Sequence, residues 1–291
     1  MTSATDPQAV APVPRLIATD LDGTLLRDDT SVSERTVAAL AAAEEAGIEV
    51  FYVTGRPARW MHVVSAYVHG HGLAICANGA AVVDLRNGGR LVTVHPLERR
   101  TALDVVLALR AATPGVVFGV ETTEGFHHEP AYPRIHAHDP GMIVAVAEKL
   151  LECPPGAGPG SGAQVVKLLA HHPSLAPDAF LSLARDAAGG LASLTRSSPS
   201  ALVEISAPGV SKASTLARCC AERGISAAEV VAFGDMPNDV EMLTWAGTSY
   251  AMGNAHPDVV AAASGRTVAN NEDGVAVVIE RILRERAEGA R

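Results

Sequence analysis

The sequence predicts an α/β fold, a Rossmann-like doubly wound parallel sheet interrupted by an inserted α+β domain. Short apolar runs rich in branched residues alternate with helical segments near the start of the 291-residue chain. The same alternation returns near the end of the chain, whereas the middle has loops rich in Pro, Gly and His. Alternating strands and helices are typical of a parallel sheet that is covered by helices on both faces.

The first part of the chain is expected to form three strands and two helices. The apolar run "RLIAT" at 15–19 precedes a helix over 31–48, in which Ser31 and Glu34 can form a capping box and Gly47 ends the helix. The remaining expected elements are a strand at 49–57 that stops at Thr-Gly, a helix at 58–70 and a third strand at 73–84.

The remaining segments define the expected domains. After the middle region the order is helix, strand, helix, strand and helix, at 211–225, 229–235, 237–247, 248–255 and 274–288. The middle region combines helical pieces such as "PLERRTALDVVLALRAA" with strand-like pieces such as "SALVEIS". We therefore expect a disordered tail at 1–14, a core built from 15–84 and 208–291, and an inserted domain at 85–207.

The composition excludes several classes of protein. A formal net charge of −9 argues against a nucleic-acid-binding surface, which needs a basic patch. The chain shows no secretory signal peptide and no apolar run of membrane-spanning length. The cysteines form no CxxC pair and are expected to be reduced thiols; they are Cys76, Cys153, Cys219 and Cys220. These features predict a cytoplasmic protein without nucleic-acid or membrane partners, either a monomer or a homodimer.

Acidic and polar residues lie at the ends of three of the expected strands. Asp20 and Asp22 end the first strand, Thr54 and Gly55 end the second, and Asp235 ends a late one. In an open parallel sheet the carboxyl ends of the strands lie along one edge, where ligands bind. Asp20 and Asp22 can also project on the same side if the backbone there is extended. Three carboxylates at one edge predict a hard divalent cation such as Mg²⁺, which would also offset their mutual repulsion.

These residue types suit phosphoryl transfer. An ionised aspartate can attack phosphorus and form an aspartyl-phosphate, while a second one gives a proton to the leaving alcohol and takes one from water. The Thr54 hydroxyl and nearby amides can hold the phosphoryl oxygens. Lys212, in "GVSKASTL" at the start of an expected helix, can neutralise charge on those oxygens.

Four motifs in the expected order resemble those of the haloacid dehalogenase (HAD) superfamily of phosphatases. They are "DLDGTL" from Asp20, "TGR" from Thr54, Lys212 before a helix, and "GDMPNDVEML" from Gly234. The "GD-xx-ND" form, "ANGA" around Asn78, "AMGNA" around Asn254 and the large insert resemble the Cof-like branch, which carries an α/β cap of the C2B type. The resemblance implies a Mg²⁺-dependent hydrolase that acts on small phosphorylated metabolites, such as sugar phosphates.

The resemblance also implies roles for individual residues. Asp20 resembles the nucleophile and a metal ligand, Asp22 the general acid/base with its backbone carbonyl on the metal, and Asp235 a second carboxylate ligand. Asp239 resembles an outer acid that holds metal waters or the lysine. The residues that resemble the phosphate cradle are Leu21, Thr54, Gly55, Lys212 and Asn238.

Several alternatives stay open at the level of sequence. The same intermediate could serve a phosphomutase or phosphotransferase, and a non-catalytic phospho-ligand-binding module is a further candidate. Lys167 either reaches the site from the cap or decorates its surface. Trp60 and Trp245 are expected in the core. The His-rich stretch "HHEPAYPRIHAHDP" is expected to be a loop, and its spacing does not favour a metal site; it contains His127, His128, His136 and His138.

Overall fold

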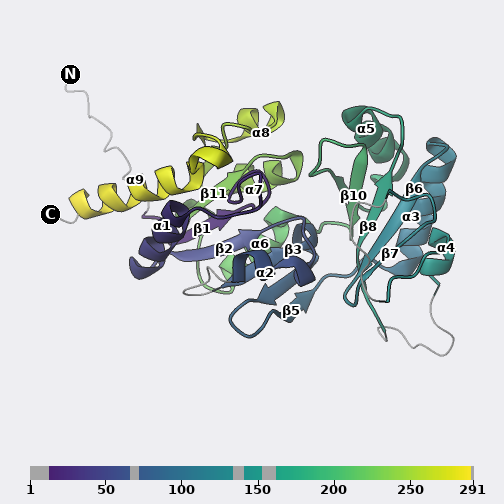
Figure 1. Cartoon of the computed structure of the whole chain (residues 1–291), viewed down its shortest axis with the longest axis horizontal. Coiled ribbons are helices and arrows are strands. Elements are labelled where there is room, and N and C mark those ends of the chain that lie inside the picture. The colour runs from purple at the N-terminus through teal and green to yellow at the C-terminus, as the bar shows by residue number, and fades with distance from the viewer. Residues whose placement is uncertain (1–12, 66–71, 134–140, 153–161, 290–291) are drawn as a thin grey trace, which may run out of the picture.

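The computed structural model describes residues 13–65, 72–133, 141–152 and 162–289. Two β-sheets, each with its own helices, lie side by side (Figure 1). Most of the expected N-terminal tail lies outside the described residues, as do Cys153, His136 and His138. Among the helices of the described ranges, none is both long and apolar enough to cross a membrane.

The first sheet forms the core of the fold. Over the described residues it has eight strands in the order β13-β12-β11-β1-β2-β3-β4-β5. The strands are β1 (Leu16–Thr19), β2 (Glu49–Val53), β3 (Leu73–Cys76), β4 (Ala81–Asp84), β5 (Arg90–Val94), β11 (Val230–Gly234), β12 (Thr248–Ala251) and β13 (Gly265–Arg266). Strands β13 to β3 are parallel, while β4 and β5 add an antiparallel edge. The expected doubly wound parallel sheet is therefore confirmed, with this antiparallel extension.

Alternate residues of the central strands face two separate hydrophobic cores. Ile17 and Val50 pack on one face of the sheet, and Leu16 and Phe51 pack on the other. The first face is covered by α1 (Glu34–Glu45) and α9 (Gly274–Gly289), and the second by α6 (Lys212–Ala221), α7 (Val240–Trp245) and α8 (Pro257–Ala262). This three-layer packing fixes the strands that carry the site.

Two local details of the core differ from the sequence-based expectations. Helix α1 is capped by Ser33, whose side chain accepts a hydrogen bond from the Thr36 amide, and not by Ser31. The segment expected as a helix at 58–70 contains a 3₁₀ turn at Ala58–Trp60 and the short α2 at His62–Ser65, and its last residues lie outside the described part of the chain. Further 3₁₀ turns lie at Ala77–Gly79, Ala227–Glu229, Pro237–Asp239 and Asn270–Glu272.

The expected third strand at 73–84 is a hairpin. Ala77, Asn78 and Gly79 all have positive φ angles, of 50°, 55° and 101°, so the chain reverses direction between β3 and β4. Strand β5, which falls within the 85–207 range expected for the insert, pairs with β4 in the core sheet. We therefore propose that the inserted unit begins after β5.

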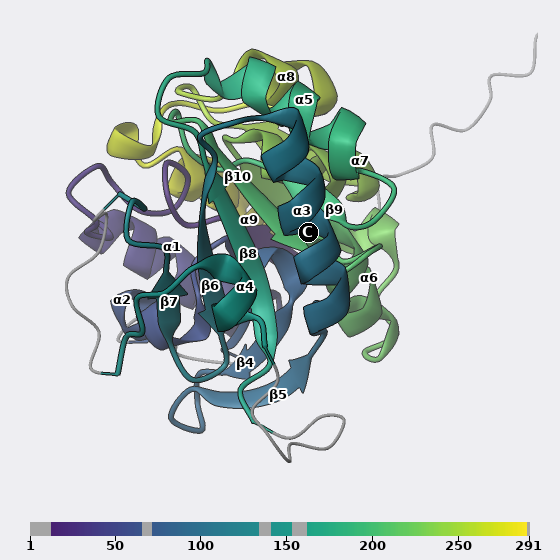
Figure 2. The same ribbon diagram turned by 90° about the vertical axis from the view of Figure 1, so that its right-hand side faces the viewer.

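The inserted unit is an antiparallel sheet with helices on its outer side (Figure 2). Its described strands, in spatial order, are β7 (Phe126–His128), β6 (Val117–Thr122), β8 (Val165–His171), β10 (Leu202–Ser206) and β9 (Ser193–Thr195). Its helices are α3 (Arg99–Ala112), α4 (Ala147–Leu150) and α5 (Pro177–Ala188). Phe118, Leu168 and Val203 pack beneath these helices. Because side chains alternate along a strand, the residues between them face away from the helices.

Candidate active site

The loops that follow β1 and β11 bring three acids together at the carboxyl edge of the core sheet. Strands β11 and β1 are adjacent and parallel, so Asp20 and Asp235 emerge next to each other. Asp20, Asp235 and Asp239 each offer one carboxylate oxygen, and these oxygens lie within 4.8 Å of one another. All three residues are buried. The predicted convergence of Asp20 and Asp235 at one edge is therefore present in the structure.

Lys212 lies between two of these acids. It is the first residue of α6, whose N-cap Ser211 accepts a hydrogen bond from the Ser214 amide. The ammonium of Lys212 donates to Asp20 Oδ1 at 2.5 Å and to Asp239 Oδ1 at 2.7 Å. Only 1% of the surface of Lys212 is exposed. The sequence-based placement of this lysine beside Asp20 agrees with the geometry.

Asp239 and Asp235 are also held by neighbouring groups. The Oδ2 atom of Asp239 accepts hydrogen bonds from the amides of Asp235 and Met236, at 3.0 and 3.1 Å. The hydroxyl of Thr24 donates to Asp235 Oδ1 at 2.8 Å. These contacts fix the orientation of both carboxylates before any ligand binds.

The charges in this cluster do not balance. Among the described residues three buried carboxylates lie together, and Lys212 forms ion pairs with two of them, Asp20 and Asp239. Burial and the nearby Asp239 raise the pKa of Asp235 to about 7. Burial opposes the charged form of Lys212, but Asp20 and Asp239 more than offset this, so the lysine pKa is raised. Clustered carboxylate oxygens with excess negative charge fit a hard divalent cation such as Mg²⁺.

Asp22 is oriented differently from the sequence-based expectation. Strand β1 ends at Thr19, so the backbone at Asp22 is not a continuing strand and the expected alternation does not apply. The Asp22 side chain points to Arg56 and accepts hydrogen bonds from its Nε and Nη2 atoms, at 2.6 and 2.5 Å. About half of the Asp22 side chain, 54%, is exposed. In the cluster of side-chain oxygens, Asp239 therefore occupies the place expected for Asp22.

The expected phosphate-cradle residues surround the cluster. The Thr54 hydroxyl accepts a hydrogen bond from the Arg56 amide at 3.0 Å. The side chain of Leu21 is fully buried, and its carbonyl accepts hydrogen bonds from the Thr24 and Leu26 amides. The Oδ1 atom of Asn238 is buried and has no hydrogen-bond partner among the described residues, so it is a candidate contact for a ligand.

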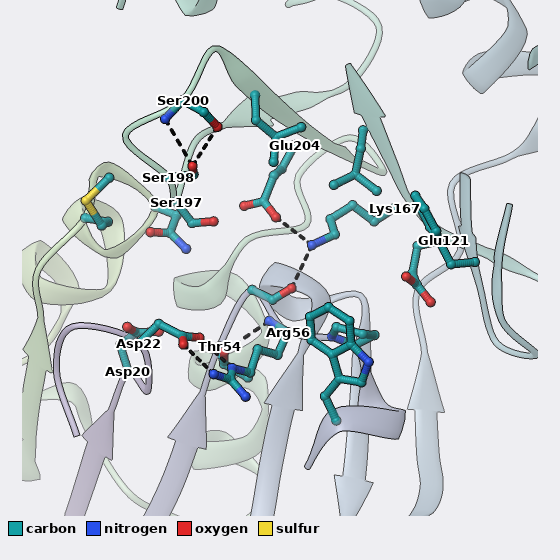
Figure 3. Close-up of a pocket in the computed structure, with 18 residues that line it drawn as sticks. Asp20, Asp22, Thr54, Arg56, Glu121, Lys167, Ser197, Ser198, Ser200 and Glu204 are labelled. Carbon is teal, nitrogen blue, oxygen red and sulfur yellow. Dashed lines mark hydrogen bonds and ion pairs between the residues drawn. The ribbon is translucent and has the colours of Figure 1, made fainter. Parts of the chain in front are cut away.

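A cavity of about 360 Å³ lies between the edge of the core sheet and the sheet of the inserted unit, which we call the cap from here on. Asp20, Asp22, Thr54, Gly55 and Asn238 line its core side. Figure 3 shows that Lys167, Glu204 and Glu121 reach toward it from the cap. Lys212 lies behind Asp20, at the edge of a second cavity that also borders Asn238. A small organic molecule can therefore lie in the first cavity with one end against Asp20.

The question about Lys167 is settled by its contacts. Its ammonium donates to the Gly55 carbonyl at 2.7 Å and to Glu204 Oε1 at 2.5 Å, and Lys167 is 4% exposed. Glu204 Oε2 accepts a hydrogen bond from Asn78 Nδ2 at 3.0 Å, and Asn78 Oδ1 accepts one from Asn238 Nδ2 at the same distance. A chain of contacts thus connects the cap strands to the core loops.

Sequence reasoning missed Glu204, Ser197 and Arg56 as cavity residues. An available signal for Glu204 was a charged residue in the middle of the apolar run "SALVEIS". Trp60 also lines the cavity, which contradicts its assignment to the core; it lies in the 3₁₀ turn at Ala58–Trp60 and not in the expected long helix.

The other residues noted in the sequence lie in the core, in a supporting loop or in a strand. Trp245 packs against the second core as expected. Asn254 donates to the Gly23 carbonyl at 2.8 Å and accepts from the Asn270 amide at 3.1 Å, and thereby supports the loop after β1. His127 and His128 lie in strand β7 and not in a loop. The described cysteines Cys76, Cys219 and Cys220 are buried thiols.

The chain matches the family model of haloacid dehalogenase-like hydrolases over residues 17–279. It is 31% identical over 273 residues to a 5-amino-6-(5-phospho-D-ribitylamino)uracil phosphatase of Bacillus subtilis, a match that covers 90% of this chain and 95% of that protein. It is 28% identical to a pyridoxal phosphate phosphatase of Escherichia coli, with coverage of 91% and 97%.

Solved structures show the same fold. A haloacid dehalogenase-like hydrolase from B. subtilis has a TM-score of 0.75 at 26% identity, with 91% of this chain and 99% of that chain covered. A phosphatase from Bacteroides thetaiotaomicron has a TM-score of 0.76 at 23% identity, with coverage of 97% and 99%. The chain belongs to the haloacid dehalogenase-like hydrolase family, which confirms the resemblance that the sequence motifs indicated and the assignment of the protein as a hydrolase.

Proposed function

We propose that this protein hydrolyses phosphate monoesters of small metabolites, with Mg²⁺ bound at the acid cluster and an aspartyl-phosphate formed on Asp20. The observation that carries this proposal is the position of Asp20. It lies at the end of β1, is held by Lys212 at 2.5 Å, is adjacent to Asp235 and Asp239, and borders a cavity of about 360 Å³. Phosphatase relatives that match almost the whole chain support the same activity.

The acid cluster provides the ligands for the cation. The carboxylates of Asp20 and Asp235 would hold Mg²⁺, with the backbone carbonyl of Asp22 as the family resemblance implies. When bound, the ion would offset the negative charge that the substrate phosphate brings to this site. Asp239 keeps Lys212 in place through the 2.7 Å contact. Lys212, Thr54, Gly55, Asn238 and the amide of Leu21 form the proposed cradle for the phosphoryl oxygens.

The covalent step begins at the carboxylate of Asp20. An oxygen of Asp20 attacks phosphorus, the bond from phosphorus to the ester oxygen breaks, and Asp22 gives its proton to that oxygen. In the second step Asp22 takes a proton from water, and the water oxygen attacks the phosphorus of the aspartyl-phosphate. Orthophosphate leaves and Asp20 is restored as a carboxylate.

For this role one carboxyl oxygen of Asp22 has to turn from Arg56 toward the ester oxygen, while the other oxygen keeps its hydrogen bond to Arg56. Both residues line the cavity, and the half-exposed Asp22 side chain has room to rotate. In this rotation an Asp22 oxygen exchanges its contact with Arg56 for one with the ester oxygen, at the same wall of the cavity. Catalytic groups often reach their final alignment only when substrate binds.

The cavity walls indicate the size and character of the substrate. Trp60, Phe126 and Leu169 supply apolar surface, while Ser197 and Glu204 supply polar groups. The two phosphatases named above act on phosphate esters that carry a uracil or a pyridoxal group. We include such nitrogen heterocycles together with sugar phosphates in the proposed substrate range.

The test is phosphate release from p-nitrophenyl phosphate by the full-length protein. We expect turnover that stops with EDTA and returns with MgCl₂, and free orthophosphate as the product, which separates a hydrolase from a phosphomutase. Asp20→Asn should lower kcat by at least about a thousandfold, because an amide cannot form the acyl phosphate. Its circular dichroism spectrum should match that of the wild type. Full activity of Asp20→Asn would disprove the nucleophile assignment.

A further inference from the structure

The charged groups of the substrate cavity form pairs with one another. Its lining contains four carboxylates, of Asp20, Asp22, Glu121 and Glu204, and two cations, of Arg56 and Lys167. Arg56 binds Asp22, and Lys167 binds Glu204. Glu121 pairs with Arg59 from the adjoining turn. The cap side of the cavity therefore has no excess of positive charge among the described residues.

Glu204 holds its negative charge firmly. Burial opposes ionisation, but Lys167 and the hydrogen bonds from Asn78 and Ser197 more than offset this, and the pKa of Glu204 is lowered. The carboxylate is 3% exposed and both of its oxygens accept hydrogen bonds. Lys167 and Glu204 therefore form a neutral pair, which offers a second anion no net positive charge in a partly buried region where the loss of its hydration is costly.

Lys167 has one donor to spare. An ammonium group has three N–H bonds. Two of them are used, for the Gly55 carbonyl and for Glu204, in the contacts that the described residues make. Lys167 lines the cavity, so the third can donate to a ligand. Because Glu204 already neutralises the lysine charge, a neutral oxygen or nitrogen acceptor is a better partner for it than a second anion.

We infer that the cavity selects phosphate esters whose leaving group is uncharged or cationic, with Lys167 donating a hydrogen bond to that group and Glu204 excluding anionic ones. This inference rests on the proposed phosphatase function and adds a rule of specificity to it. Lys167 is the residue that contacts the substrate. Glu204 acts through Lys167, whose positive charge it neutralises. The rule disfavours esters that carry a carboxylate or a second phosphate on the leaving group.

A matched series of aryl phosphates tests the rule on the wild-type protein. The series is phenyl phosphate, 4-(aminomethyl)phenyl phosphate and 4-carboxyphenyl phosphate, whose leaving groups are neutral, cationic and anionic at pH 7. We expect kcat/KM for the carboxylated ester to be at least about tenfold below that of phenyl phosphate, because the neutral Lys167–Glu204 pair does not compensate the carboxylate for its lost hydration. The aminomethyl ester should be hydrolysed at least as efficiently as phenyl phosphate. Equal kcat/KM for all three esters would overturn the inference.

Glu204→Gln tests the residue assignment. It removes the negative charge and keeps an acceptor for Asn78 and Lys167, so the discrimination against the carboxylated ester should shrink about tenfold or reverse. Asp104→Asn is the control. Asp104 lies on the outer helix α3, so this substitution makes the same change in net charge at a position away from the cavity. An equal change of the ratio in both variants would overturn the role of Glu204.

The failure of the function and the failure of the rule give different results. If no ester of the series releases phosphate with MgCl₂ present, the proposed function fails and the rule falls with it. If all are hydrolysed without discrimination, the function stands and the rule alone is wrong. If Glu204→Gln does not fold, as judged by circular dichroism, the wild-type series still decides for or against the rule.

Discussion

The carboxylate of Asp22 is bound at two points by the guanidinium of Arg56, at 2.6 and 2.5 Å. The two residues come from neighbouring loops, after β1 and after β2. Arg56 thus fixes the starting position of the proposed general acid/base. Two parallel hydrogen bonds restrict a carboxylate more than a single contact does.

Replacement of Arg56 should therefore weaken the proton-transfer step. We expect Arg56→Ala to lower kcat for p-nitrophenyl phosphate about tenfold. This is smaller than the whole contribution of general acid catalysis, because Asp22 itself is still present. The change follows from the loss of orientation of Asp22. Steady-state kinetics at saturating MgCl₂ measure it.

Arg35 provides the matched control for this variant. It binds Glu280 at two points, at 2.8 and 2.7 Å, between helices α1 and α9. Arg35→Ala removes the same kind of ion pair away from the cavity and should leave kcat unchanged, with a loss of stability below about 1 kcal/mol. Unchanged kcat in Arg56→Ala as well would show that the pair does not orient Asp22.

Lys212 should contribute to stability as well as to activity. Lys212→Met leaves three buried carboxylates without their cation, and we expect the free energy of unfolding to fall by about 3–5 kcal/mol without metal. MgCl₂ should restore part of this stability but not the activity. Urea unfolding with EDTA or with MgCl₂ measures both effects.

The exposed Lys149 on α4 is the control for the substitution. Lys149→Met should change stability by less than about 0.5 kcal/mol. A Lys212→Met variant as stable as the wild type in EDTA would contradict the charge imbalance inferred for the cluster.

The raised pKa of Asp235 predicts how pH affects the metal-free protein. This pKa is about 7 in the folded state, from burial and the nearby Asp239, against about 3.9 for an unfolded aspartate. Between these values the folded protein binds more protons than the unfolded chain, so the contribution of Asp235 to stability is lost as pH rises from about 4 to 7. We expect the increase in Tm caused by MgCl₂ to be larger at pH 8 than at pH 5.5.

Differential scanning fluorimetry of the wild type and of Asp235→Asn isolates this contribution. Histidines whose pKa is lowered by burial, such as His95 and His171, are present in both proteins, so their effect cancels in this comparison. The variant should lose the part of the pH dependence of the Mg²⁺ effect that comes from Asp235, while Asp20, whose pKa burial also raises, keeps the remainder. An equal MgCl₂ effect at both pH values in the wild type would refute the prediction.

Gly79 should tolerate no side chain. Its φ is +101°, and a Cβ there would overlap the carbonyl oxygen of Ser211, just before Lys212. Gly79→Ala therefore combines backbone strain with a clash, and should cost more than about 3 kcal/mol and lower kcat by displacing Lys212. Gly89, with φ +77° and open space around it, is the control: Gly89→Ala should cost about 1 kcal/mol and leave kcat intact. If Gly79→Ala and Gly89→Ala lost the same stability, backbone strain alone would account for the effect and the clash with Ser211 would not contribute.

The core of the site was predictable because sheet geometry constrains it. Once 15–19 and 229–235 are recognised as parallel strands, Asp20 and Asp235 have to emerge at the same edge. The helix start at Lys212 follows from Ser211 as its cap. These inferences need only local pattern and the regular geometry of a parallel sheet.

The orientation of Asp22 and the contacts of the cap were harder to predict from the sequence. The turn after Thr19 decides where the Asp22 side chain points, and a pattern of alternation does not describe a turn. The meeting of Lys167 with Gly55 depends on how two separately folded sheets pack, which involves residues more than 100 positions apart. The sequence predicts a continuous strand at 73–84, and not the observed hairpin at Asn78, because the residues on both sides of the turn are similarly apolar.

The pairing of β1 with β11 has a consequence for synthesis of the protein. The partner of Leu16 is Val230, so one edge of β1 stays unpaired until a segment about 200 residues later has been synthesised. At typical translation rates of 5–20 residues per second this interval lasts roughly 10–40 s. During that time a nascent chain presents an apolar strand with an open edge, which other chains can join. Premature termination within the cap would make that exposure permanent, and such fragments should aggregate or require chaperones.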